Sequence, residues 1–150
     1  MKLEPVFVAN LAYFDVPANQ FVTNGVEQSV TVDTPTIDIF NDAFFKDNLQ
    51  RADFFFEINN TINRAYTLDL IYLDKNNQTL FSTNFVIPAY SGVENLVTKT
   101  EIFQNAKLDL LKSTTKIAFI LKMLPGPLLT ENSTGSIKLR SGVTAYLVVK

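Results

Sequence analysis

The sequence predicts an all-β fold in which two antiparallel sheets pack against each other. The first observation is composition: 13 of the 150 residues are Phe and 5 are Tyr, and aromatic side chains, like the β-branched ones, are enriched in strands. The second is periodicity, because apolar and polar side chains alternate in several runs, as in a strand with one buried face. The third is a single run of helical spacing, which predicts one short connecting helix.

The first strand that this alternation predicts spans residues 52–58. It places Phe54 and Phe56 on one face and Phe55 on the other. A polar turn is expected directly after it, at residues 59–63.

The clearest hairpin consists of alternating runs at residues 66–73 and 79–87 around the polar stretch 74–78. Asp and Asn tolerate turn conformations and bond to nearby backbone, so this stretch is expected to be the turn. Pro88 ends the second strand, because proline cannot donate to a ladder. A further strand is predicted at residues 93–98.

Two more strands are predicted in the C-terminal part, at residues 116–123 and 137–149. The second contains Ser141 and Gly142, and a glycine inside a strand marks a bend. Residues 124–135 lie between these strands and are expected to be a loop, because Pro, Gly, Asn and Ser are frequent there.

The connecting helix is predicted at residues 104–112, from the helical spacing of Phe103, Ala106 and Leu110. The segment 40–49 fits a helical turn and a non-helical segment equally well, so both alternatives stay open.

About seven or eight strands, spaced roughly 8 to 12 residues apart, are typical of an immunoglobulin-like or fibronectin III-like β-sandwich. A parallel sheet is disfavoured because its crossovers would need several helices. Neither a repeat nor a linker nor a shift in composition divides the chain, so residues 1–150 are predicted to form one domain.

Composition excludes several classes of function. The formal net charge is −2, so nucleic acid is not an expected partner. The chain has no His, Cys or Trp, which removes the usual zinc ligands, thiol nucleophiles and the base of a serine triad. We therefore predict a non-enzymatic protein with no catalytic residue, cofactor or metal. No apolar run approaches the ~20 residues of a membrane span, so no transmembrane segment is expected.

Weaker chemical hypotheses concern a hydrolase and a calcium site. The stretch 113–116 has the S-x-x-K spacing of some serine hydrolases, although these carry the motif at the start of a helix. Paired carboxylates serve glycosidases, and the acids considered are Glu57, Asp69, Glu94, Glu101 and Asp109.

Calcium prefers oxygen ligands. The densest group of Asp and Asn residues, which we interpret as a helix-capping turn, is Asp38, Asn41, Asp42, Asp47 and Asn48.

The aromatic residues of two segments are the remaining signal. Because Phe55 lies on the face opposite its neighbours, it is either buried on a second side or part of an apolar patch. We expect burial beneath the segment 40–49. The alternative is a binding patch of Phe44, Phe45 and Phe55 for a partner protein or an apolar ligand such as an acyl chain.

One part of the chain contains a distinctive order of motifs: a strand and asparagine turn at 53–60, a strand ending in Tyr72-Leu73-Asp74, and a later strand that closes with Ile87-Pro88-Ala89. In this order of motifs the sequence resembles small immunoglobulin-like sandwich domains of bacterial envelope proteins and lipoproteins, of the FxLYD type and the late-embryogenesis-abundant type 2 type. This resemblance implies an exported sandwich and transfers no functional residue.

The function expected first is a non-enzymatic module of a bacterial cell envelope, in the periplasm or at the cell surface, with a role in binding or assembly. The signal peptide or lipid anchor is taken to have been removed. The alternative is a structural subunit of a virion or surface fibre, in which the long last strand, ending at Val149, would pair across subunits. A hydrolase is the third and weakest hypothesis.

Overall fold

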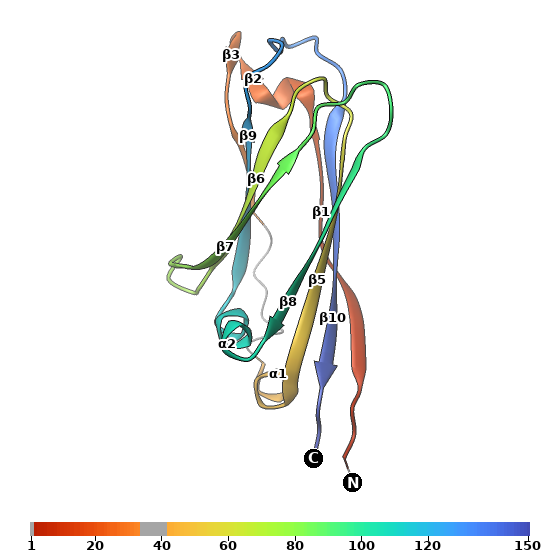
Figure 1. Ribbon diagram of the computed structural model, residues 1–150. Coiled ribbons are helices and arrows are strands. Elements are labelled where there is room, and N and C mark those ends of the chain that lie inside the picture. The colour runs from red at the N-terminus through yellow and green to blue at the C-terminus, as the bar shows by residue number, and fades with distance from the viewer. Residues whose placement is uncertain (1, 34–41) are drawn as a thin grey trace.

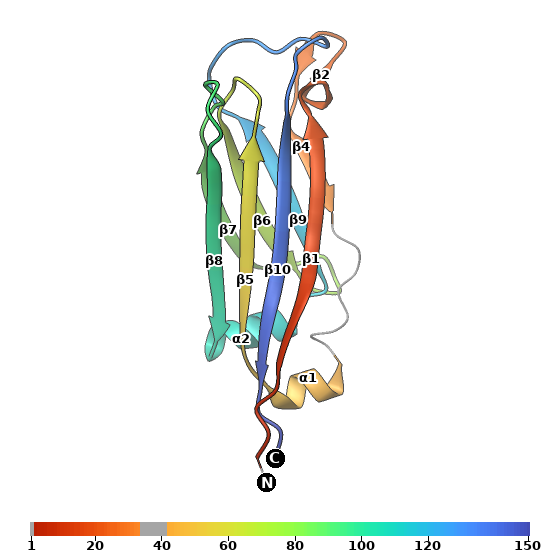
Figure 2. The same ribbon diagram turned by 90° about the vertical axis from the view of Figure 1, so that its right-hand side faces the viewer.

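The computed structural model describes residues 2–33 and 42–150, which form a sandwich of two four-stranded antiparallel sheets (Figures 1 and 2). Sheet I contains, in spatial order, β1 (Val6–Pro17), β10 (Ser136–Leu147), β5 (Leu49–Asn60) and β8 (Leu96–Gln104). Sheet II contains β4 (Val30–Asp33), β9 (Lys116–Met123), β6 (Tyr66–Leu73) and β7 (Thr79–Ile87). The all-β two-sheet sandwich predicted from the sequence is confirmed.

Short elements close the two ends of the sandwich. The helices α1 (Ala43–Asn48) and α2 (Ala106–Lys112) lie at the end that also holds both termini, as Figure 2 shows. The 3-10 helix η1 (Ala18–Phe21) and the small hairpin of β2 (Val22–Thr23) and β3 (Val26–Glu27) lie at the opposite end. None of the helices in the described part of the chain is long and apolar enough to cross a membrane.

The order of connections is that of a jelly roll. The first long strand pairs with the last, β1 with β10, and the pairs β4–β9 and β5–β8 follow inward to the hairpin of β6 and β7. The chain thus behaves as one long hairpin that is wrapped over two sheets. An immunoglobulin sheet instead has its first two strands side by side. Here β1 and β4 lie in different sheets, so the expected immunoglobulin strand order is wrong.

Aromatic side chains fill the space between the sheets. Phe54 and Phe56 of β5 point inward and are completely buried. The ring centroid of Phe54 lies 6.3 Å from that of Tyr72 in β6, and that of Phe56 lies 6.5 Å from that of Phe119 in β9. Each such ring contributes about 1.5–3 kcal/mol by leaving water. The sheets are therefore joined through the faces that the alternation in sequence marks as apolar.

Most predicted elements form, with shifts at their ends. The helix begins at Ala106, later than expected, because β8 continues to Gln104. The open choice at 40–49 is settled by α1, whose first turn is capped by Asp42: its carboxylate accepts a hydrogen bond from the N–H of Phe44 at 2.9 Å. Phe40 and Asn41 lie outside the described residues.

The last strand occupies the interior of sheet I. β10 pairs with β1 along one edge and with β5 along the other. Both of its edges are therefore hydrogen-bonded within the chain, and the expected pairing of this strand across subunits is wrong. A subunit contact by strand pairing would need one of the outer strands.

A buried arginine fixes the loop between β9 and β10. The Arg64 guanidinium donates to Glu27 at 2.8 Å and to the carbonyl of Pro127 at 2.8 Å. Glu27 also accepts from the N–H of Leu129, and this bond, together with Arg64, lowers the pKa of the Glu27 carboxyl. The predicted loop 124–135 is thus held against β3, and the N–H of Ala18 in η1 donates to the carbonyl of Gly135 at the end of this loop.

Candidate functional site

The outer face of sheet I carries most of the large apolar side chains that the sheets leave in water. Side chains that are paired across antiparallel strands point to the same face. Val8, Thr144, Asp53 and Ile102 form one such row from β1 to β8. The exposed apolar residues of this face are Val6, Val8, Tyr13, Phe55, Leu96, Ile102 and Tyr146.

The outer face of sheet II differs. Its rows consist mainly of polar side chains, for example Asp69 beside Asn84, which donates a hydrogen bond to it. Among its described residues only Val86 is a large apolar side chain with high exposure. Exposed apolar side chains that gather on one face can mark an interaction site, so the outer face of sheet I is the candidate site.

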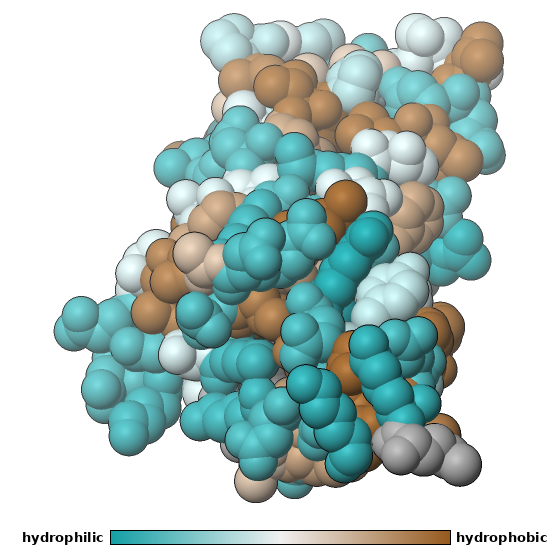
Figure 3. Space-filling model, turned by 60° about the horizontal axis from the view of Figure 1, so that its bottom comes forward, coloured by the Kyte–Doolittle hydropathy of each residue, from teal (hydrophilic) through white to brown (hydrophobic). Residues whose placement is uncertain are grey.

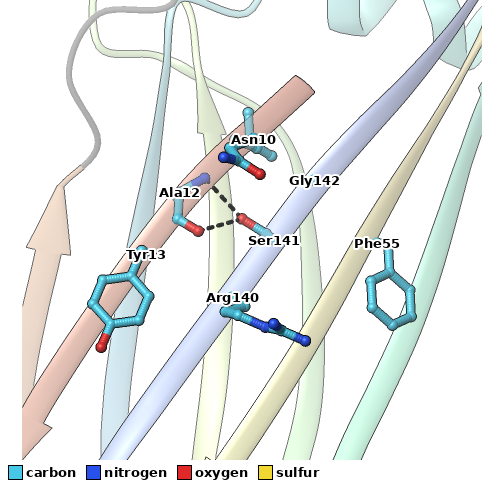
Figure 4. Close-up of a pocket in the computed structure, with 8 residues that line it drawn as sticks. Asn10, Ala12, Tyr13, Phe55, Arg140, Ser141 and Gly142 are labelled. Carbon is cyan, nitrogen blue, oxygen red and sulfur yellow. Dashed lines mark hydrogen bonds between the residues drawn. The ribbon is translucent and has the colours of Figure 1, made fainter. Parts of the chain in front are cut away.

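A depression with a volume of about 610 Å³ lies in the middle of this face (Figure 4). Gly142 of β10 lies in it, between Asn10 of β1 and Phe55 of β5 in the same cross-strand row. The absence of a side chain at Gly142 leaves this space open. The rings of Tyr13 and Phe55 stand on opposite sides of β10, as Figure 4 shows.

A β-bulge in β1 aims Tyr13 outward. Leu11 and Ala12 together lie opposite Ser141, so the side-chain alternation shifts by one residue and resumes with Tyr13 paired to Arg140. The buried Ser141 hydroxyl stabilises the bulge: it accepts from the N–H of Ala12 and donates to the carbonyl of the same residue, each at 2.9 Å. Without the bulge, Tyr13 would point into the core.

A second depression, of about 280 Å³, continues the first along the sheet. The two share Tyr13 and Arg140 in their lining. The second adds Glu57 and Asn59 of β5, with Lys138 of β10. We call the combined hollow, from Gly142 to Lys138, the Gly142 groove.

The charges of this face neutralise one another. The Arg140 guanidinium pairs with Glu57, and Arg51 forms two hydrogen bonds with Asp53, at 2.8 and 2.9 Å. The hydrogen bonds with Asp53 raise the pKa of Arg51. Lys138 stands opposite Asp15 in the β1–β10 register. The face therefore carries equal numbers of acidic and basic side chains in its strands and has no excess of either sign.

The three phenylalanines of the alternative patch lie on two different elements, α1 and β5. Phe55 is 45% exposed on the outer face of sheet I, so its expected burial beneath the segment 40–49 is wrong. Phe44 and Phe45 lie on α1, where the Phe45 ring centroid is 6.0 Å from that of Phe7. Figure 3 shows that hydrophilic side chains dominate this end of the molecule.

The other candidate groups are dispersed. Of the acids considered for hydrolysis, Glu57 and Glu94 line a common depression. Glu101 accepts from the Thr83 hydroxyl at 2.9 Å and lies 3.3 Å from the Lys107 ammonium.

The S-x-x-K stretch follows α2, with Ser113 as its C-cap residue. The described residues contain no group of three or more acids that could hold a metal, and Asp38 and Asn41 lie outside them.

Sequence reasoning named Phe55 as one member of the alternative patch and missed the residues that the structure places beside it. Asn10 and Tyr13 reach the site only because β1 pairs with a strand about 130 residues later in the chain, in which Ser141 bonds to Ala12 at a separation of 129 residues. The one local signal was Gly142, since a glycine inside a strand indicates a bulge or a close approach of backbones. Its ideal Cβ would lie 3.3 Å from the carbonyl oxygen of Ala9.

Comparisons by sequence give no family. No protein-family model matches the chain, and no curated protein matches it either. The resemblance to the FxLYD and late-embryogenesis-abundant type 2 families therefore has no support from a family match.

Solved structures with the same kind of β-rich architecture do match. A presumed secreted protein from Parabacteroides distasonis is 13% identical with a TM-score of 0.54, over 78% of this chain and 37% of that one. The VP2 subviral particle of infectious bursal disease virus is 11% identical with a TM-score of 0.48, over 95% of this chain and 32% of that one. Empty-head turnip yellow mosaic virus is 9% identical with a TM-score of 0.39, over 100% of this chain and 82% of that one.

The chain thus spans about a third of the length of the first two structures. The match to the secreted protein supports the fold, and no residue role is transferred at such identities.

Proposed function

We propose that this protein is a non-enzymatic binding module of the bacterial cell envelope or cell surface, and that it binds its ligand through the outer face of sheet I. The observation that carries the proposal is the contrast between the two outer faces. The outer face of sheet I exposes seven large apolar side chains, whereas the described part of the outer face of sheet II exposes only Val86. Removing such surface from water is worth about 25 cal/mol per Å² to a complex.

The chemistry of the face supports binding without catalysis. Its two arginines, Arg51 and Arg140, each pair with a neighbouring carboxylate. A general acid or nucleophile would need a shifted pKa and a free position toward a substrate. The chain also has no His and no Cys, the side chains that most often serve these roles.

The location outside the cytoplasm rests on fold likeness. The similarity to a presumed secreted bacterial protein, at a TM-score of 0.54, is compatible with an extracellular or envelope position. The assignment to the periplasm or to a lipoprotein is part of the proposal. Fractionation of cells that express the natural gene, with detection of the protein outside the cytoplasm, tests it.

A second candidate function is that of a structural subunit in a surface fibre or virion. The uncharged stretch Val6–Asn10 of β1 favours it, because its side chains are exposed on both faces of the strand. Among the described strands, β1 pairs only with β10. A strand with one open edge can pair with a second copy. Monodisperse monomer in light scattering at high concentration would count against this candidate.

Nuclear magnetic resonance with a library of small neutral fragments tests the binding proposal directly. We expect the amide shifts that change on fragment addition to cluster around Asn10, Phe55 and Gly142. Shifts spread over the surface, or centred on Val86 of sheet II, would show that the outer face of sheet I is not a binding surface. A hydrolase screen of the same sample is expected to give no turnover.

A further inference from the structure

The Gly142 groove has the dimensions of a site for an elongated ligand. Gly142 and Lys138 are four residues apart on β10, which corresponds to about 13 Å along a strand. The two depressions of this groove have volumes of about 610 and 280 Å³ and meet at Tyr13 and Arg140. Ligand sites of small molecules have typical volumes of about 300–1,000 Å³.

The side chains of the groove combine aromatic rings with hydrogen-bonding groups. Tyr13 is 66% exposed, and together with Phe55 it presents ring surface on both sides of β10. Asn10 and Arg140 lie between or beside these rings in Figure 4 and supply donors that can reach a ligand. The C–H faces of a sugar ring pack on aromatic rings, while its hydroxyl groups need such donors and acceptors.

The charge balance of the groove favours an uncharged ligand. Glu57 already pairs with Arg140, whose side chain is 74% exposed. An anionic ligand would have to compete with this carboxylate and would meet no excess of positive charge. Hydroxyl groups can bond to both partners of the ion pair without separating them.

Two other occupants fit the face less well. The backbone groups of sheet I are used in its ladders, so a peptide would be recognised through an edge strand and not through this face. A second copy stacked face to face would bring two hollows together and leave the middle of the interface unfilled, whereas protein interfaces pack as densely as interiors.

We propose that the Gly142 groove binds an uncharged oligosaccharide chain between the rings of Tyr13 and Phe55, with Arg140 and Asn10 bonding to its hydroxyl groups. This assignment rests on the proposed function, since it names the ligand class of the same face.

Affinity electrophoresis in native gels tests the assignment. The probes are dextran, galactomannan, arabinoxylan and mixed-linkage β-glucan, followed by an array of neutral oligosaccharides. We expect at least one probe to retard the protein. Tyr13→Ala and Phe55→Ala are expected to weaken binding about tenfold or more each, Tyr13→Phe to bind more tightly than Tyr13→Ala, and Val86→Ala, the control on sheet II, to bind like the natural protein.

The assignment is overturned if no neutral glycan binds, if only polyanionic glycans bind, or if the three alanine variants bind equally. Thermal melts establish that each variant is folded. If neutral glycans fail while fragments still shift amides around Gly142, the ligand class is wrong and the binding module stands. If concentration-dependent dimers form that Phe55→Ala abolishes, a second copy occupies the face and the oligosaccharide assignment is wrong.

Discussion

The strands of both sheets alternate inward and outward side chains in the same way, but the outward side chains differ between the sheets. Many are apolar in sheet I, and most are polar in sheet II. In sheet II the aromatic side chains Tyr66 and Tyr72 point inward and are buried, and the outward positions are mostly polar. In sheet I the tyrosines Tyr13 and Tyr146 point outward into water. Because each sheet needs only its inner face for the core, the outer faces are free to differ. This difference is the reason why we propose binding at the outer face of sheet I.

The largest expected difference in stability between a core variant and a surface variant concerns two adjacent phenylalanines of β5. We expect Phe54→Ala to lower the free energy of unfolding by about 3–5 kcal/mol, because it removes a fully buried ring and leaves a cavity. Phe55→Ala is expected to cost far less, since its ring already lies partly in water. Urea denaturation of both variants measures this. Similar losses would mean that Phe55 serves the fold and not a ligand.

The bulge of β1 is tested by Ser141→Ala, with Ser82→Ala on the outer face of sheet II as the control. Ser141 is buried and satisfies both backbone groups of Ala12, so we expect a loss of about 1–3 kcal/mol. Ser82 is exposed, and a change within about 0.5 kcal/mol is expected there. Equal melting temperatures for the two variants would show that the bulge does not depend on this hydroxyl.

Alkaline pH is expected to distinguish buried from exposed tyrosines. Burial raises the pKa of Tyr72 well above its ordinary value of 10.0, with a smaller contribution from Glu101. The unfolded chain therefore releases this proton first as pH rises. The stability contribution is fully present below pH 10 and is lost above it, by up to about 1.4 kcal/mol per pH unit.

Urea denaturation between pH 8 and 11 measures this dependence, and Tyr72→Phe is its control. The variant is expected to have a shallower decline than the natural protein above pH 10. A decline that begins well below pH 10 would have another cause, and an identical decline in both proteins would exclude Tyr72 as its source.

The smallest effect is expected from the ion pair in the groove. Arg140 is mostly exposed, so Glu57→Gln should change the free energy of unfolding by less than about 1 kcal/mol. Chemical denaturation at low and high salt measures it. A loss well above this range would mean that the pair stabilises sheet I, and that its arginine is less available to a ligand than the exposed side chain suggests.

The local alternation of apolar and polar side chains was sufficient to predict the strands that have one buried face. The hairpin of β6 and β7 alternates cleanly and has a polar turn, so its position was predicted almost to the residue. No individual strand was predicted for β1, because its first five residues are exposed on both faces and its bulge interrupts the alternation. Where the alternation is missing, the β-propensity of the residues alone is not enough to predict a strand.

The jelly-roll order and the groove both depend on which strands become neighbours. Alternation predicts that the Phe55 side chain points away from the core, and it gives no information on the bulge that turns Tyr13 outward or on the pairing between β1 and β10. Phe55 could be identified because its neighbours Phe54 and Phe56 fix its opposite orientation. Phe44 and Phe45 share its chemistry and lie on α1, so similar composition did not mean a common surface.

The first and last parts of the described chain meet at the end of the molecule that holds α1 and α2, where Leu3 and Val149 form an antiparallel bridge with hydrogen bonds of 2.8 Å in both directions. A short linker could therefore join them, and new ends could be opened in the exposed turn at Asp74–Gln78. Such a circular permutant would retain every strand of both sheets. A tag fused to the new ends would lie at the turn between β6 and β7, whereas a tag on the original chain lies beside α1 and α2. A label could therefore be attached at either of these two places.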